Sequence, residues 1–279
     1  KVAMHYPFAH GIVNNWDDLE KLWHNTIYNE LRILPKYHPV LLTEPPFNPA
    51  VDREKMAHIM FETFNVPALY IAIRGVLSLY ATSRTTGVVV QSGDSLTNTL
   101  PIIDGCVLPQ GIQQIQLAGM DLTDHLCKLL TEQGHQNLTR ENLKDLKEKL
   151  GCVAIDYDKE MFSCISEPKE KRYELPDGRV IKINTERIMC TEPLFQTSLL
   201  DPNHFGASGI HEMAYNSIMK TDLDIRKEMY KSVVLAGGST LFPGLAERLK
   251  LELRALCNTP MPINVIALPE RKYTSWIGG

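Results

Sequence analysis

The sequence has no Cys-x-x-Cys pair and no histidine near a cysteine at zinc-site spacing, although it contains six cysteines. It also has no apolar run near the roughly 20 residues that a membrane-spanning helix needs. No charge sign dominates, because 29 basic and 33 acidic residues leave a formal net charge of −4. A chain without a positive field has no general attraction for nucleic acid or an anionic membrane. These absences predict reduced thiols, and partners that include neither nucleic acid directly nor a membrane.

Short apolar runs alternate with amphipathic segments along the 279 residues. The runs that are typical of strands buried on both faces are residues 40–42, 69–73, 87–90 and 232–235. Apolar residues recur at helical spacing after Asp52, which is a candidate N-cap, and again over residues 121–130. Pro243-Gly244 is predicted to open a further helix.

Two segments instead combine short strands with tight turns. Residues 88–107 contain turns at 92–95 and 104–105, which predicts an antiparallel meander. Residues 173–181 centre on Pro-Asp-Gly, which predicts a hairpin. Hairpins together with alternating strands and helices predict a mixed α/β protein.

Two turns have the composition of a ligand site, at residues 92–95 and 236–240. A glycine-rich turn at a strand end lets backbone N–H groups approach a phosphate or an adenine ring. Neither turn has the spacing of a P-loop or of a dinucleotide-binding motif. Each turn taken alone is more typical of simple chain reversal.

Two charged clusters also have a simpler interpretation when they are taken alone. Lys147 and Glu148 share a predicted helix, where alternating charges are typical of a solvated face. Asp121, Asp124 and His125 lie at a helix start, where carboxylates are expected as caps rather than as metal ligands. The residues by themselves therefore predict an α/β protein with a candidate nucleotide site.

Several long stretches together resemble actin. Three of them read ELPDGRVI at residues 174–181, LAGGSTLFPGLAERL at 235–249 and PERKYTSWIGG at 269–279. Others are residues 10–13, 16–23, 28–32, 38–65, 76–87, 117–126 and 209–220. The likeness runs along essentially the whole chain, so the sequence is identified as a divergent member of the actin family or an actin-related protein.

The resemblance implies an α/β protein with the two-lobed actin, Hsp70 and sugar-kinase fold, which is ribonuclease H-like. A nucleotide and a divalent metal would lie between the lobes. The implied parts are subdomain 1-like residues 1–81, subdomain 3-like residues 82–117 and 203–279, and subdomain 4-like residues 118–202. The family's first phosphate hairpin would precede Lys1 and its last helices would follow Gly279, so we expect a fold that is incomplete at both ends.

The resemblance also assigns a site for ATP or ADP, built from the second phosphate hairpin and the adenosine side. The implied nucleotide-binding residues are Ser92, Gly93, Asp94, Ser95, Leu96, Gly119, Lys144, Lys147, Glu148, Gly237, Gly238, Leu241, Phe242 and Lys272. Lys144 stands where the family has arginine, and Leu241 and Phe242 replace a Met-Tyr pair. A largely apolar adenine slot tolerates such changes.

The phosphate side departs from the family pattern at four positions. Gln91 replaces the aspartate that helps to hold metal and water, and Ser95 replaces a glycine beside the γ-phosphate. Asn98 replaces the histidine near the attacking water, and Arg74 replaces the glutamine that orients this water. Loss of one positioned group typically costs roughly 10²–10³ in rate. The resemblance thus leaves no intact catalytic residue and no metal ligand, and we expect weak or absent ATP hydrolysis.

The two changes of charge have the same sign. Aspartate to Gln91 removes a negative charge, and glutamine to Arg74 adds a positive one. The cleft gains about two positive charges, as much as a divalent metal supplies. We hypothesise that Arg74 partly replaces the metal, so that Mg²⁺ or Ca²⁺ would be held weakly. The alternative is that Arg74 acts like an arginine finger in a working ATPase.

The expected role is a cytoplasmic, actin-like cytoskeletal or scaffold subunit whose partners are other actin-fold subunits or actin-binding proteins. The family's cleft for partner helices is retained around Tyr80 and Thr85. The loop at residues 131–139 is shorter than that of actin and the loop at 199–208 is longer, so standard filament geometry is not expected. Two alternatives stay open: an active filament-forming ATPase, and a nuclear actin-related subunit of a chromatin-remodelling complex.

Overall fold

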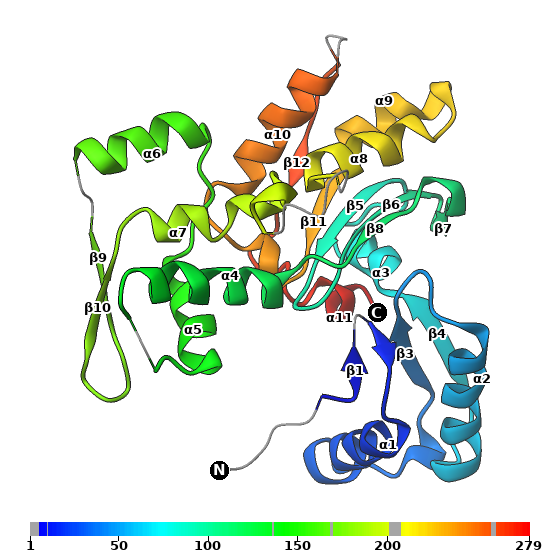
Figure 1. Cartoon of the computed structure of the whole chain (residues 1–279). Helices are drawn as coiled ribbons and strands as arrows, with labels where there is room; N and C mark the ends of the chain where they lie inside the picture. Colours follow the sequence, from blue (N-terminus) through cyan, green and yellow to red (C-terminus); the bar gives the residue numbers. More distant parts are fainter. Residues whose placement is uncertain (1–5, 10, 136, 168–169, 201–207, 258–260) are drawn as a thin grey trace.

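The computed structural model describes residues 6–9, 11–135, 137–167, 170–200, 208–257 and 261–279. These residues form a mixed α/β fold, as predicted. Figure 1 shows a central sheet with the segment from β1 to β4 on one side and the segment from α4 to β10 on another. Within the described ranges, no helix has the length and apolar character needed to cross a membrane.

The centre of the fold is a six-stranded sheet in the order β12-β11-β5-β6-β7, in which β8 also pairs with β6. Its strands are β5 (Gly87–Ser92), β6 (Thr97–Ile103), β7 (Cys106–Val107), β8 (Gln113–Ile115), β11 (Val233–Ala236) and β12 (Val265–Ile266). β11 runs parallel to β5 and β12, whereas β6 runs antiparallel to β5, β7 and β8. The predicted antiparallel meander is therefore confirmed.

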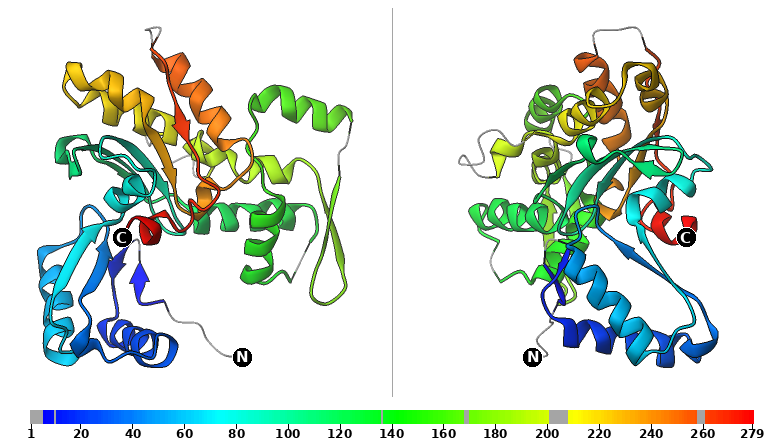
Figure 2. Two further views of the ribbon diagram at one scale, coloured as in Figure 1. Left: turned by 180° about the vertical axis from the view of Figure 1, so that it is seen from behind. Right: turned by 90° about the vertical axis from the view of Figure 1, so that its right-hand side faces the viewer.

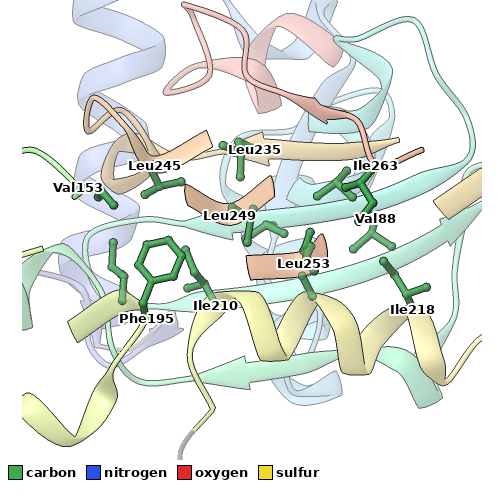
Figure 3. Close-up of a cluster of buried hydrophobic side chains, with 14 of the residues drawn as sticks. Val88, Val153, Phe195, Ile210, Ile218, Leu235, Leu245, Leu249, Leu253 and Ile263 are labelled. Carbon is green, nitrogen blue, oxygen red and sulfur yellow. The ribbon is translucent and has the colours of Figure 1, made fainter. Parts of the chain in front are cut away.

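Helices cover both faces of this sheet (Figure 2). They are α3 (Arg74–Tyr80), α8 (Ile210–Met219), α9 (Leu223–Lys231), α10 (Leu245–Leu256) and α11 (Thr274–Gly278). Because successive strand residues point to opposite faces, Val88 and Val90 join the core with α8 and α10, which Figure 3 shows in close-up. Val89 and Val234 pack instead with Leu79 of α3. The prediction of burial on both faces is confirmed for β5 and β11.

A second core lies in the segment from α4 to α7. Its elements are α4 (Gly119–Glu132), α5 (Arg140–Leu150), α6 (Tyr157–Ser166), β9 (Lys171–Glu174), β10 (Val180–Ile183) and α7 (Glu186–Met189). Leu126, Leu143 and Ile181 are among the side chains buried there. The predicted hairpin is confirmed, because β9 and β10 pair antiparallel around the Pro-Asp-Gly turn. The cysteines Cys106, Cys127, Cys152, Cys164 and Cys190 are free thiols.

In the first part of the chain, the structure contradicts the predicted burial of two strands. Its elements are β1 (Phe8–Ala9), β2 (Ile12–Val13), α1 (Trp16–His24), η1 (Asn25–Glu30), η2 (Pro35–Tyr37), β3 (Val40–Glu44), α2 (Ala50–His58), η3 (Ile59–Thr63) and β4 (Leu69–Ile73). β3 and β4 form a separate parallel pair, and Leu41 is 40% exposed and Tyr70 66% exposed. Burial of these strands on both faces was a wrong prediction, because the core side chains from η1 and η3 cover one face only.

Asp52 is not the N-cap of its helix, which corrects a second prediction. α2 begins at Ala50 after Pro49, and Asp52 lies in the first turn. A carboxylate there still interacts favourably with the helix dipole. Pro243-Gly244 does precede α10 as predicted, and Gly244 adopts a left-handed conformation with a φ of 87°. The remaining short helices are η4 (Pro109–Gly111), η5 (Glu192–Leu194), η6 (Thr197–Leu199) and η7 (Gly238–Thr240).

The core around α10 allows a direct test of packing. Leu249 is fully buried between α8 and the sheet, whereas Leu251 on the same helix is 47% exposed. We expect Leu249→Ala to lower the free energy of unfolding by about 2–5 kcal/mol, because it leaves a cavity in the core. Leu251→Ala, the control, should change it by about 0.5 kcal/mol or less. Denaturant unfolding of both variants checks this, and equal effects would contradict the packing described.

Candidate functional site

Two turns meet at one end of the central sheet. Because Gln91 of β5 lies opposite Ala236 of the parallel strand β11, the two strands end side by side. Gly237 follows with a φ of 92°, and a side chain there would overlap the Ser92 carbonyl oxygen. Turns at the carboxyl ends of adjacent parallel strands are a common place for ligands to bind.

The start of α4 joins these turns. The Gly119 N–H donates to the Gly93 carbonyl oxygen at 3.1 Å, and the Met120 N–H donates to the Asp94 carbonyl oxygen at 2.7 Å. Ser239 Oγ donates to the same Gly93 oxygen at 2.6 Å. Backbone hydrogen bonds thus hold three segments together that are far apart in the sequence.

A cavity of about 280 Å³ opens on one side of this junction. It is lined by Gly93, Asp94, Lys144, Lys147, Glu148, Gly238, Ser239, Leu241, Phe242 and Lys272. Most residues that the resemblance assigned to the adenosine side therefore lie together here, and we call this space the adenosine-side cavity. Gly119 and Gly237 do not line it but form the close contacts beneath it.

A second cavity of about 260 Å³ lies on the other side, and we call it the phosphate-side cavity. It is lined by Phe8, Gly11, Thr43, Pro45, Arg74, Gln91, Gly93, Asp94, Ser95, Leu96 and Asn98. The four positions at which the sequence departs from the family pattern, Arg74, Gln91, Ser95 and Asn98, are thus brought together. The two cavities share Gly93 and Asp94.

The side chains of two predicted site residues form hydrogen bonds within the fold. Ser92 is 1% exposed, its hydroxyl shares a hydrogen bond of 2.8 Å with Thr97 Oγ1, and it lines neither cavity. Lys147 Nζ donates to the Gly119 carbonyl oxygen and, at 2.7 Å, to Thr123 Oγ1. Burial lowers the pKa of Lys147. This ammonium therefore ties α5 to the first turn of α4.

The charged groups at the junction are distributed unevenly. Lys144 Nζ lies 3.6 Å from the Asp94 carboxylate. Burial lowers the pKa of Arg74, and among the described residues its guanidinium has no ion pair and no side-chain hydrogen bond. Asn98 is 3% exposed, and its Oδ1 has no hydrogen-bond partner. On this side, the Arg74 guanidinium and the Asn98 Oδ1 are thus without protein partners among the described residues.

The donor set does not suit a divalent cation. Asp94 is the one carboxylate among the residues that line the phosphate-side cavity, and it is paired with Lys144. Nowhere in the described ranges do three His, Cys, Asp or Glu side chains group together as a metal site would need. Asp121 accepts the Ala118 N–H at 2.8 Å, which is the capping role predicted for it, whereas Asp124 pairs with Arg140.

Sequence reasoning missed two polar residues of the site. Ser239 lies in the adenosine-side cavity and Thr43 in the phosphate-side cavity. Ser239 follows a Gly-Gly pair in a turn already identified as a candidate, which is a usable signal. Thr43 had no comparable signal, because only the fold brings the end of β3 to the site.

The predicted partner cleft lies elsewhere on the surface. Tyr80 is 41% exposed at the end of α3, and the Thr85 carbonyl oxygen accepts the Gly105 N–H at 2.8 Å. A side chain at Gly105 would overlap the Tyr80 hydroxyl, so the two predicted residues flank one turn. Most of the predicted long loop at residues 199–208 lies outside the described residues, as does position 136 of the short loop.

The close contact under the site can be tested with neighbouring glycines. Gly237→Ala places a methyl group against the Ser92 carbonyl and forces a positive φ on alanine. We expect it to lower the free energy of unfolding by about 1–3 kcal/mol. At Gly238 the nearest atom to an added methyl group is Lys272 Cγ at 3.9 Å. Gly238→Ala should therefore change stability by about 0.5 kcal/mol or less. Thermal unfolding of both variants provides the measurement, and an inverted order would refute the contact.

Comparison with known protein families agrees with this geometry. The family model described as Actin matches residues 1–279, the whole of the sequence. The mixed sheet with helices on both faces, and the paired cavities at the ends of its parallel strands, are consistent with that match. The chain therefore belongs to the actin family.

Proposed function

We propose that this chain is an actin-like cytoskeletal or scaffold subunit that binds an adenine nucleotide and hydrolyses it slowly or not at all. Proteins with the actin fold generally bind a nucleotide and a divalent cation. The observation that carries the proposal is the junction of two cavities at Gly93 and Asp94, where β5 and β11 end together.

The adenosine-side cavity has the composition of a nucleoside site. Leu241 and Phe242 provide apolar surface of the kind on which a purine ring packs. The Glu148 carboxylate would accept hydrogen bonds from ribose hydroxyl groups, and Lys272 adds a donor to the same lining. The shared turn at Gly93 leads from this cavity to the phosphate side, as a nucleotide requires.

The phosphate-side cavity supports slow hydrolysis. Hydrolysis is faster where a positioned group accepts the proton of the attacking water. Arg74 and the amides Gln91 and Asn98 are poor proton acceptors, and the Asp94 carboxylate forms an ion pair with Lys144. The lining therefore supports binding of phosphate groups more than their hydrolysis.

The role in the cell is part of the same proposal. We place the chain in the cytoplasm and at the cytoskeleton, with the exposed surface at Tyr80 and Thr85 as the cleft for actin-binding proteins. We also propose the division into a subdomain 1-like part over residues 1–81, a subdomain 3-like part over 82–117 and 203–279, and a subdomain 4-like part over 118–202. Separate buried clusters before β4 and around α5 support this division.

Nucleotide binding can be tested on α5, which offers a matched pair of glutamates. Glu148 lines the adenosine-side cavity, whereas Glu141 is exposed at the start of the same helix and lines no described cavity. We expect Glu148→Ala to weaken binding about tenfold, because a charge-assisted hydrogen bond to the ribose is lost. Glu141→Ala should leave affinity unchanged. Titration with a fluorescent ATP analogue measures both, and no binding to the unaltered protein would end the proposal.

Hydrolysis is tested by phosphate release from ATP and magnesium, with and without conditions that promote assembly. We expect release at least about 10²-fold slower than from an active ATPase of this family, because the positioned catalytic groups are absent. Release that increases with assembly would contradict the proposal and favour the filament-forming ATPase. Co-purification with a chromatin-remodelling complex from nuclei would instead favour the nuclear alternative.

A further inference from the structure

Arg74 gives the phosphate-side cavity a cation of its own. It is the first residue of α3, directly after β4, and its backbone carbonyl accepts a hydrogen bond from Ser275 Oγ at 3.2 Å. α3 also packs on the sheet through Leu79. These contacts fix the backbone of Arg74, which is one of the residues that line the cavity.

The guanidinium of Arg74 forms no ion pair within the described part of the fold. Arg74 makes no ion pair with any described residue, although the cavity excludes much of the solvent around it. Burial is the one cause that shifts its pKa, and no acidic neighbour opposes that shift. Because arginine stays protonated even when it is buried, the group is a positive charge that lacks a counter-ion.

The charges around the cavity favour an oxyanion over a metal. Mg²⁺ at nucleotide sites is bound by one or two carboxylates together with phosphate oxygens, and the single carboxylate in this lining, Asp94, forms an ion pair with Lys144. A divalent ion in this cavity would also be repelled by the arginine. Gln91 and Asn98 are partners in the β5–β6 register, and each amide NH₂ group is a donor of the kind that a phosphate oxygen accepts. The cavity thus combines an unpaired cation with two amides that can donate hydrogen bonds.

We propose that Arg74 contacts the distal phosphate of the nucleotide directly and takes the place of the divalent cation, so that this chain binds nucleoside triphosphate without metal. The inference rests on the proposed nucleotide binding and deepens it. Arginine binds phosphate oxygens through two parallel N–H groups, which supplies both charge and orientation.

The test compares binding of a fluorescent ATP analogue in magnesium, in calcium and in excess EDTA. We expect affinities in the three conditions to agree within about threefold, since less than 1 kcal/mol would then depend on the metal. Binding that requires magnesium or calcium would overturn the inference but leave the proposed function standing. Absence of binding in all three conditions would overturn both.

Two variants distinguish a specific effect of the Arg74 side chain from a general effect of net charge. Arg74→Gln should weaken binding in EDTA by about 10- to 100-fold, because a charge-assisted phosphate contact is removed. Arg84→Gln makes the same change in net charge at an exposed arginine outside both cavities and should have no effect. An unchanged affinity of Arg74→Gln in EDTA would overturn the inference. Unfolding measurements confirm that each variant is folded.

A double variant supplies the reverse experiment. Arg74→Gln combined with Gln91→Asp removes the built-in cation and adds a carboxylate at a position that lines the same cavity. We expect this protein to bind the analogue at least about tenfold more tightly in magnesium than in EDTA. If metal has no effect on the double variant, the exchange between arginine and metal is refuted.

Discussion

The parallel pairing of β5 with β11 is the constraint on which the site depends. Because the two strands are in register up to Gln91 and Ala236, the turns that follow them must occupy neighbouring space. Gly237 permits this, since any side chain there would collide with the backbone at Ser92. The start of α4 is then anchored to the same turn through Gly119. Both cavities are consequences of this one junction, which is why they share a wall.

The two sides of the junction differ in how the fold uses their polar groups. On the adenosine side, Lys147 forms hydrogen bonds that join α4 and α5, and Lys144 forms an ion pair with Asp94. On the phosphate side, Arg74 and the Asn98 amide keep unsatisfied capacity. Buried polar groups without partners are costly for a fold. An unpaired guanidinium in the cavity lining is therefore a stronger indication of an anionic ligand than the shape of the cavity alone.

Arg74 also links the site to distant parts of the chain. β4 leads directly into α3, so the separate β3–β4 pair determines where the arginine enters the site. α11 contacts α3 from the far end of the sequence, through hydrogen bonds of Ser275 with Arg74 and Ser78. The phosphate side consequently depends on three regions that form no continuous motif, whereas most of the adenosine-side lining comes from two helical segments and one turn.

The α/β class, the buried strands β5 and β11, the hairpins and most of the residues at the candidate site could be predicted from the sequence, because apolar runs, turn residues and family motifs are local. The contacts of individual side chains could not. The fold leaves one face of β3 and β4 open at Leu41 and Tyr70, places Asp52 inside its helix, and uses Ser92 and Lys147 for internal hydrogen bonds. Burial and hydrogen-bond partners depend on which segments pack together, and local patterns do not specify that.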